Sequence, residues 1–196
     1  MIPLWNRVVL LAATLLASLA ALPPMGDFLM RMMLTQMLVQ IPLIFAGAAI
    51  GATRIQWPPR AAWLKWSAQG APGLLFSTMV LAFWMTPIAL DHAAADPRWE
   101  VAKIASIVIA GVSASISWRL ASNVIRIFYV GNMVWMTITA GMLYQESTER
   151  LCNAYLWDDQ TTTGQALVGV SVALAVAWMV LLARRELRRV PQATQR

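Results

Sequence analysis

The sequence predicts an all-α, polytopic membrane protein: a six-helix transmembrane bundle with both termini in the cytoplasm. Hydrophobic residues make up 59% of the chain and charged residues 12%, against about 25% charged residues in a soluble domain. The mean hydropathy is +0.61. The apolar residues fall into long segments, and the charges are unequally divided between the connecting loops. These observations predict one integral membrane domain over residues 1–196.

A membrane-spanning helix needs about 20 mostly apolar residues. The six segments that meet this requirement are 4–22, 33–53, 72–90, 101–120, 123–143 and 164–184. Pro72 and Gly164 are predicted to open the third and the sixth spans. The first span also resembles a cleavable signal peptide, and its removal would leave five spans with the same orientation. The very short junction at 121–122 predicts that the fourth and fifth spans are antiparallel neighbours.

The charges predict the orientation. With the N-terminus inside, the cytoplasmic side holds most of the cations, which are Arg7, Arg54, Arg60, Lys65, Arg119, Arg126, Arg184, Arg185, Arg188, Arg189 and Arg196. The outer side holds only Arg31, Arg98, Lys103 and Arg150. This is the positive-inside asymmetry, here expected for the inner (plasma) membrane of a bacterium. The net charge of +6 therefore indicates topology and contact with lipid, and it excludes nucleic acid as the partner.

One polar row inside the second span is the most informative local pattern. Met33, Gln36, Met37 and Gln40 have the i, i+3, i+4, i+7 spacing of one helix face. Polar groups inside a membrane lower the stability unless they face other helices or a wet cavity. The row should therefore face the interior of the bundle, where Gln36 and Gln40 either hydrogen-bond between helices or line a site.

Soft sulfur groups near the outer side are candidate ligands for Cu(I). The candidate metal residues are Met33, Met37, His92 and Cys152. Each has a simpler interpretation, since methionine fills gaps in apolar cores, a lone loop histidine is usually solvated, and a buried cysteine is usually inert. Cu(I) is therefore the one cofactor considered, with no cofactor as the alternative.

The sequence contains no nucleophile elbow, Walker loop, dinucleotide fingerprint, HExxH or CxxC motif. We therefore expect a protein that is not an enzyme. No predicted span holds a lysine or carboxylate at mid-depth, which argues against an ion-coupled transporter. Before the last span, the acidic side chains of Asp158 and Asp159 suit the start of a helix.

Two motifs together resemble the CtaG-type (caa3) cytochrome c oxidase assembly factors. The segment Gln36-Met37-Leu38-Val39-Gln40 is similar to the His-Met-x-x-His element on an early span of that family. The pair Asp159-Gln160, followed by Gly164, is similar to the family's Asp-Gln-x-x-x-Gly signature before a late helix. The resemblance implies a polytopic factor associated with copper delivery to haem-copper oxidase. Both histidine positions are glutamine here, so it implies a shared scaffold more directly than a shared copper site.

Two functions follow as hypotheses. The first is a non-enzymatic membrane factor for copper handling or cytochrome oxidase assembly at the outer face of the inner membrane. The alternative is an accessory subunit that packs against other integral membrane subunits, as in a respiratory oxidase or a copper membrane monooxygenase. The ten tryptophans and twelve methionines would then serve as lipid anchors and adaptable contact surface.

Overall fold

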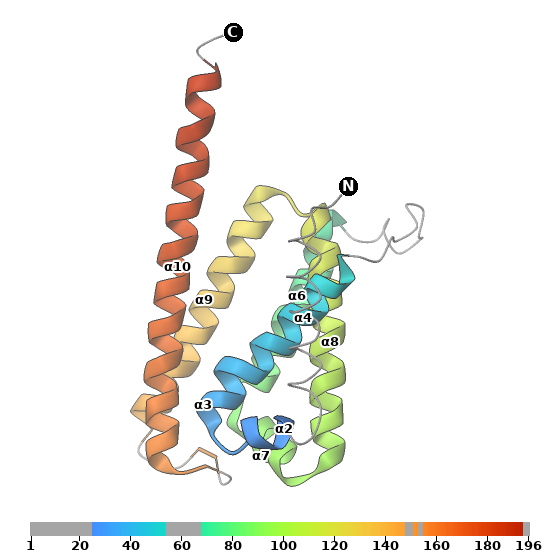
Figure 1. The fold of residues 1–196 in the computed structure, drawn as a ribbon, viewed down its shortest axis with the longest axis vertical. Coiled ribbons are helices and arrows are strands. Elements are labelled where there is room, and N and C mark those ends of the chain that lie inside the picture. Colours follow the sequence, from blue (N-terminus) through green and yellow to red (C-terminus); the bar gives the residue numbers. More distant parts are fainter. Residues whose placement is uncertain (1–24, 54–67, 148–150, 153–154, 194–196) are drawn as a thin grey trace.

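The computed structural model describes residues 25–53, 68–147, 151–152 and 155–193, and the regular structure in these ranges is entirely helical (Figure 1). The elements are α2 (Met25–Leu29), α3 (Met33–Thr35), the π-helical turn η1 (Gln36–Gln40), α4 (Ile41–Ala52), the 3-10 turn η2 (Ala68–Gly70), α6 (Ala71–Trp84), α7 (Pro87–Ala95), α8 (Pro97–Leu120), α9 (Asn123–Glu146) and α10 (Trp157–Ala193). The all-α prediction is confirmed for this part of the chain.

Several of these helices are long and apolar enough to cross a membrane, so the protein is a multi-pass membrane protein. Four continuous candidates are Met33–Ala52, Pro97–Leu120, Asn123–Glu146 and Trp157–Arg184, and the bent pair α6 and α7 makes a fifth. The predicted span 4–22 lies outside the described residues. The six-helix count and the cytoplasmic location of both termini remain predictions.

The predicted span 72–90 is broken into two helices. Helices α6 and α7 are bent by 71° across the break between them. The cause is Pro87, which disfavours the helical conformation of the residue before it. Thr86 is accordingly extended, with φ −79° and ψ 138°. The Tyr144 hydroxyl donates to the Met85 carbonyl oxygen at 2.5 Å, so a carbonyl at the break finds a partner inside the bundle.

Two helices begin earlier than predicted. Helix α8 begins at Pro97, where the Asp96 side chain accepts a hydrogen bond from the backbone N–H of Arg98 at 2.8 Å. Helix α10 begins at Trp157, so the expectation that Gly164 opens the last span is wrong. The acidic residues before Gly164 belong to the first turn of α10, where they face the positive end of the helix dipole.

The helices form two groups. Helices α4 and α6 each pack on α8, α9 packs along α10, and α10 also contacts α3. Figure 1 shows α8 and α9 running in opposite directions but diverging from their junction. The two spans are therefore antiparallel, as predicted, but α9 packs along α10 and not along α8.

The two ends of the bundle differ in charge. We call the end where α8 begins and α9 ends the acidic end, because it carries all the carboxylates whose side chains the structure describes: Asp91, Asp96, Glu100, Glu146, Asp158 and Asp159. The opposite end, called the basic end, carries Arg119, Arg126 and Arg184. The larger core cluster contains Met33, Tyr144 and Tyr155, and the smaller contains Leu74 and Ala121.

Candidate functional site

The polar row predicted from the second span lies inside the bundle near the acidic end. Met33, Gln36 and Gln40 are 0% exposed and Met37 is 2% exposed. The row follows η1, in which the backbone N–H of Ile41 donates to the carbonyl of Gln36. The next residue, Pro42, cannot donate to the carbonyl of the preceding turn and crowds it, and a wider turn relieves that conflict. The local sequence thus explains both the bulge and the inward direction of the row.

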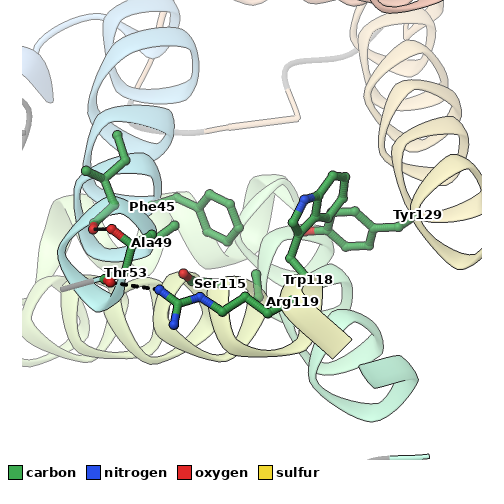
Figure 2. A pocket seen from close by; sticks show the side chains of 9 residues that line it. Phe45, Ala49, Thr53, Ser115, Trp118, Arg119 and Tyr129 are labelled. Atoms are coloured by element: carbon green, nitrogen blue, oxygen red, sulfur yellow. Dashed lines mark hydrogen bonds between the residues drawn. The ribbon is translucent and has the colours of Figure 1, made fainter. Parts of the chain in front are cut away.

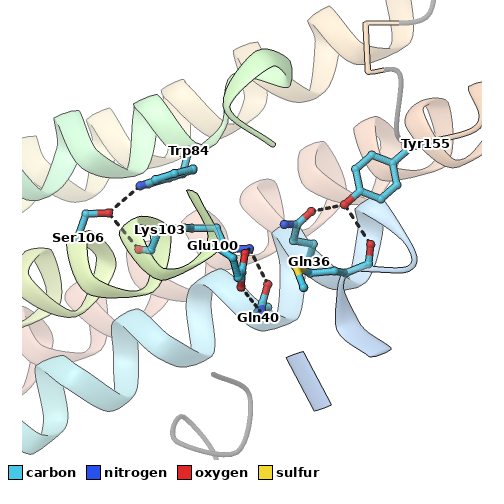
Figure 3. Close-up of polar contacts among 8 residues, drawn as sticks. Gln36, Gln40, Trp84, Glu100, Lys103, Ser106 and Tyr155 are labelled. Carbon is cyan, nitrogen blue, oxygen red and sulfur yellow. Dashed lines mark hydrogen bonds and ion pairs between the residues drawn. The ribbon is translucent and has the colours of Figure 1, made fainter. Parts of the chain in front are cut away.

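A charged pair on α8 completes the site beside Gln40. The Lys103 ammonium contacts Glu100 Oε2 at 2.5 Å, with the lysine side chain 0% exposed and the glutamate side chain 15% exposed. Lys103 Nζ also donates to Gln40 Oε1 at 3.1 Å, and Gln40 Nε2 donates to Glu100 Oε1 at 3.3 Å. The three side chains form a closed triad, which Figure 3 shows between α8 and η1. Within it, each charged group meets an opposite charge and an amide dipole.

A second polar contact lies at Gln36. The Tyr155 hydroxyl approaches two acceptors, Gln36 Oε1 at 2.5 Å and the Met30 carbonyl oxygen at 3.0 Å (Figure 3). Gln36 Nε2 is buried and has no hydrogen-bond partner within the described part of the chain. Turning the carboxamide over would let Nε2 donate to Tyr155 and would leave the hydroxyl proton for Met30. In either orientation Tyr155 ties the loop before α10 to the row.

The Asp159-Gln160 pair has a structural role. Asp159 Oδ2 accepts from the backbone N–H of Met33 at 2.6 Å, so a side chain of α10 caps the start of α3. Gln160 is 1% exposed. Its Oε1 accepts from the Leu151 N–H at 2.9 Å, and its Nε2 donates to the Tyr144 carbonyl at 3.1 Å. The two adjacent residues thereby fasten the first turn of α10 to α3, to the preceding loop and to the end of α9.

Gly164 also acts through packing. A Cβ atom added at Gly164 would lie 2.6 Å from the Gly141 carbonyl oxygen, and one added at Gly141 would lie 2.7 Å from the Gly164 carbonyl oxygen. The two glycines therefore permit the close crossing of α9 and α10. All three residues of the second motif, Asp159, Gln160 and Gly164, thus hold helices together at the acidic end.

The four predicted metal residues do not all come together. Met33, Met37 and Cys152 belong to the same buried cluster, whereas His92 is exposed on α7. The His92 ring stacks on Trp99, with 5.1 Å between the ring centroids and 20° between the planes. Among the described residues, no group of three or more His, Cys, Asp or Glu side chains is placed to hold a metal ion. His92 is therefore not part of the site formed by the polar row.

Cys152 is in an environment that favours the neutral thiol. It is 1% exposed, and its Sγ–H donates to the Pro87 carbonyl oxygen at 3.7 Å. Burial, followed by the negative charge of Asp91, raises the pKa of the Cys152 thiol to about 12. Burial and the nearby acidic groups also raise the pKa of the Tyr155 hydroxyl. Because metals bind the thiolate, Cys152 has little tendency to act as a ligand at neutral pH.

Sequence reasoning missed Glu100, Lys103 and Tyr155. Lys103 is predicted to lie on the outer side, as one of the loop cations. The structure places it near the start of α8, at the acidic end, with its side chain completely buried. The available signal was its position inside the predicted span 101–120, three residues after Glu100, which is the spacing of an ion pair on a helix.

No family model, no curated protein and no solved structure matches this chain. The resemblance to the CtaG-type assembly factors therefore rests on its two motifs and stays a prediction.

Proposed function

We propose that this protein is a non-enzymatic accessory subunit or assembly factor that acts through contacts with other integral membrane subunits. The observation that carries the proposal is that both glutamines of the row bind side chains from other elements of the same chain. Gln40 is bound by Lys103 and Glu100, and Gln36 is bound by Tyr155. Such contacts between elements hold helices in register, which is what a scaffold requires. The bacterial inner membrane and the assembly of a cytochrome oxidase are the setting that the resemblance implies.

The residues present do not fit a copper site at the two glutamine positions. A neutral carboxamide is a poor ligand for Cu(I) beside imidazole or thiolate. In addition, the Lys103 ammonium lies 3.1 Å from Gln40 Oε1, so a positive charge already occupies the space in front of that oxygen. A second cation at this position would be repelled.

The lateral surface offers room for protein partners. In both α9 and α10, only 11% of the most apolar window is buried inside the bundle. Phe128 is 76% exposed, Trp135 71% and Met179 65%. Either lipid or another membrane subunit can cover such apolar faces. The proposal predicts that a subunit covers part of them.

The experiment is purification in a gentle detergent, combined with a photo-crosslinking residue at Trp135. We expect stoichiometric co-migration with larger membrane subunits and a specific crosslinked product. The control places the crosslinker at Ile109 of α8, which is 55% exposed but lies in the other helix group. A stable lone monomer, with crosslinks to lipid only, would overturn the proposal.

Cu(I) handling is the second candidate, because Met33, Met37 and Cys152 share one buried cluster. Here the thioethers, rather than the glutamines, would hold the ion. Titration of the purified protein with Cu(I) tests this candidate. The Met33→Leu/Met37→Leu variant should lose binding, whereas Met79→Leu/Met142→Leu, at residues 62% and 48% exposed, should keep it. Equal binding by the first variant and the wild type would remove the metal role.

A further inference from the structure

The basic end contains a hollow that the polar site does not use. It lies between α4, α8 and α9 and has a volume of about 370 Å³. This volume falls within the usual range of about 300–1,000 Å³ for ligand pockets. Most of its wall is apolar or aromatic, and includes Phe45, Ala49, Ile50, Ala114, Trp118 and Tyr129 (Figure 2). The hollow therefore suits a hydrocarbon group.

One arginine lines this hollow, and a second contacts one of its lining residues. The exposed side chain of Arg119 lines it and donates through Nη2 to the Thr53 carbonyl oxygen at 2.7 Å, at the end of α4 (Figure 2). A guanidinium carries five N–H donors, so this contact leaves others for a ligand. Arg126 lies 5.4 Å from the centre of the Trp118 ring and donates to the Trp118 carbonyl. Of the carboxylates whose side chains are described, none lies at this end.

Aromatic contacts link the walls of the hollow to both helix groups. Trp118 of α8 makes edge contacts with Tyr129 of α9 and with Trp178 of α10, each with 6.2 Å between ring centroids. The Tyr129 hydroxyl is also 3.0 Å from Ser77 Oγ of α6. Although α8 and α9 diverge, these contacts hold the two lining residues Trp118 and Tyr129 together. The hollow is thus a formed feature of the bundle.

We infer that the hollow binds an acyl chain of one anionic phospholipid, with the headgroup phosphate held by Arg119 and attracted by Arg126. A neutral apolar molecule would use the lining but not the cations, and a free phosphate would use the cations but not the lining. A phospholipid uses both. Basic pockets between membrane helices are suited to anionic headgroups, and guanidinium pairs well with phosphate. This inference is independent of the function proposed above.

The test is native mass spectrometry of the full chain, incubated in detergent with equal amounts of phosphatidylglycerol and phosphatidylcholine that carry the same acyl chains. We expect preferential retention of one phosphatidylglycerol. Arg119→Gln should lower this preference about fivefold, the factor that corresponds to about 1 kcal/mol per cation at a membrane surface. The matched control is Arg184→Gln, which removes an exposed arginine of the same end but outside the hollow. It should leave the preference unchanged.

A second pair of variants tests the hollow itself. Ala49→Phe should fill it and abolish retention of both lipids, whereas Ala173→Phe, on an exposed face of α10, should retain the lipid. Because Ala49 is close to α8, Ile50→Trp provides an independent way to fill the hollow, and circular dichroism confirms the fold of each variant. Equal retention of the two lipids by the wild type would overturn the inference. So would undiminished retention by both filled variants, or complete displacement of the lipid by inorganic phosphate.

Discussion

Removal of the buried ammonium should be among the most damaging single changes in this protein. In Lys103→Met, Glu100 loses its contact at 2.5 Å and keeps only the amide of Gln40 at 3.3 Å. Breaking a buried ion pair by removing one partner costs about 3–5 kcal/mol. Because Glu100 is 15% exposed and keeps the amide of Gln40 as a partner, the lower value, about 3 kcal/mol, is expected. This is a large part of a stability of about 5–15 kcal/mol.

The assay is reversible unfolding in mixed micelles with increasing dodecyl sulfate, followed by far-UV circular dichroism. The double variant Glu100→Leu/Lys103→Met removes both charges, and we expect it to regain most of the lost free energy of unfolding. The matched control is Arg98→Met on the same helix, which removes an exposed cation and should change the stability by less than about 0.5 kcal/mol. A cost below about 1 kcal/mol for Lys103→Met, or a double variant no more stable than Lys103→Met alone, would contradict the structural role of the ion pair.

Three further predictions concern the other contacts of the acidic end. Asp159→Ala should lower the free energy of unfolding by about 0.5–2 kcal/mol, as for the loss of a helix cap, and Asp159→Asn should recover part of it in the same assay. Gly164→Ala should destabilise by about 1–3 kcal/mol because its new Cβ meets the Gly141 carbonyl. Gly169→Ala, with no atom within 4 Å of the added Cβ, should be neutral or stabilising by up to about 1 kcal/mol, and equal effects of the two changes would contradict the close crossing. Cys152, with a thiol pKa of about 12, should react slowly with a maleimide at pH 8 in the folded protein and faster as the pH rises toward 12. Because this pKa is raised above that of the unfolded chain, the contribution of Cys152 to stability is complete below the unfolded value of 9.0 and is lost as the pH rises toward 12. A fast reaction at pH 8 would show that the thiol is not held as described.

The inward direction of the polar row could be predicted because it depends on local periodicity. Met33, Gln36, Met37 and Gln40 follow the spacing of one helix face. Inside a membrane, a face with polar side chains is stable only when it points into the bundle. The break before Pro87 also had a local signal, since proline restricts the residue before it. That signal was outweighed by the apolar composition of the whole segment 72–90.

The partners of the row could not be predicted, because they come from distant parts of the chain. Lys103 meets Gln40 across 63 positions of sequence, and Tyr155 meets Gln36 across 119. Asp159 was expected at the start of a helix, and it does stand there. Its side chain, however, caps α3, which lies 126 positions away in the sequence. Such pairings depend on how α3, α8 and α10 pack, which periodicity along one helix does not encode.

The charged groups at the two ends of the bundle differ in burial and in their partners. At the acidic end, Gln40, Glu100 and Lys103 bind one another, and Asp159 is used as a cap. At the basic end, Arg119 is exposed beside an apolar hollow. A group that is already paired inside the protein gains little from an outside ligand, whereas an exposed guanidinium beside an apolar cavity gains both charge pairing and apolar burial. Changes at Lys103 should therefore alter stability without altering lipid preference, and changes at Arg119 should do the reverse.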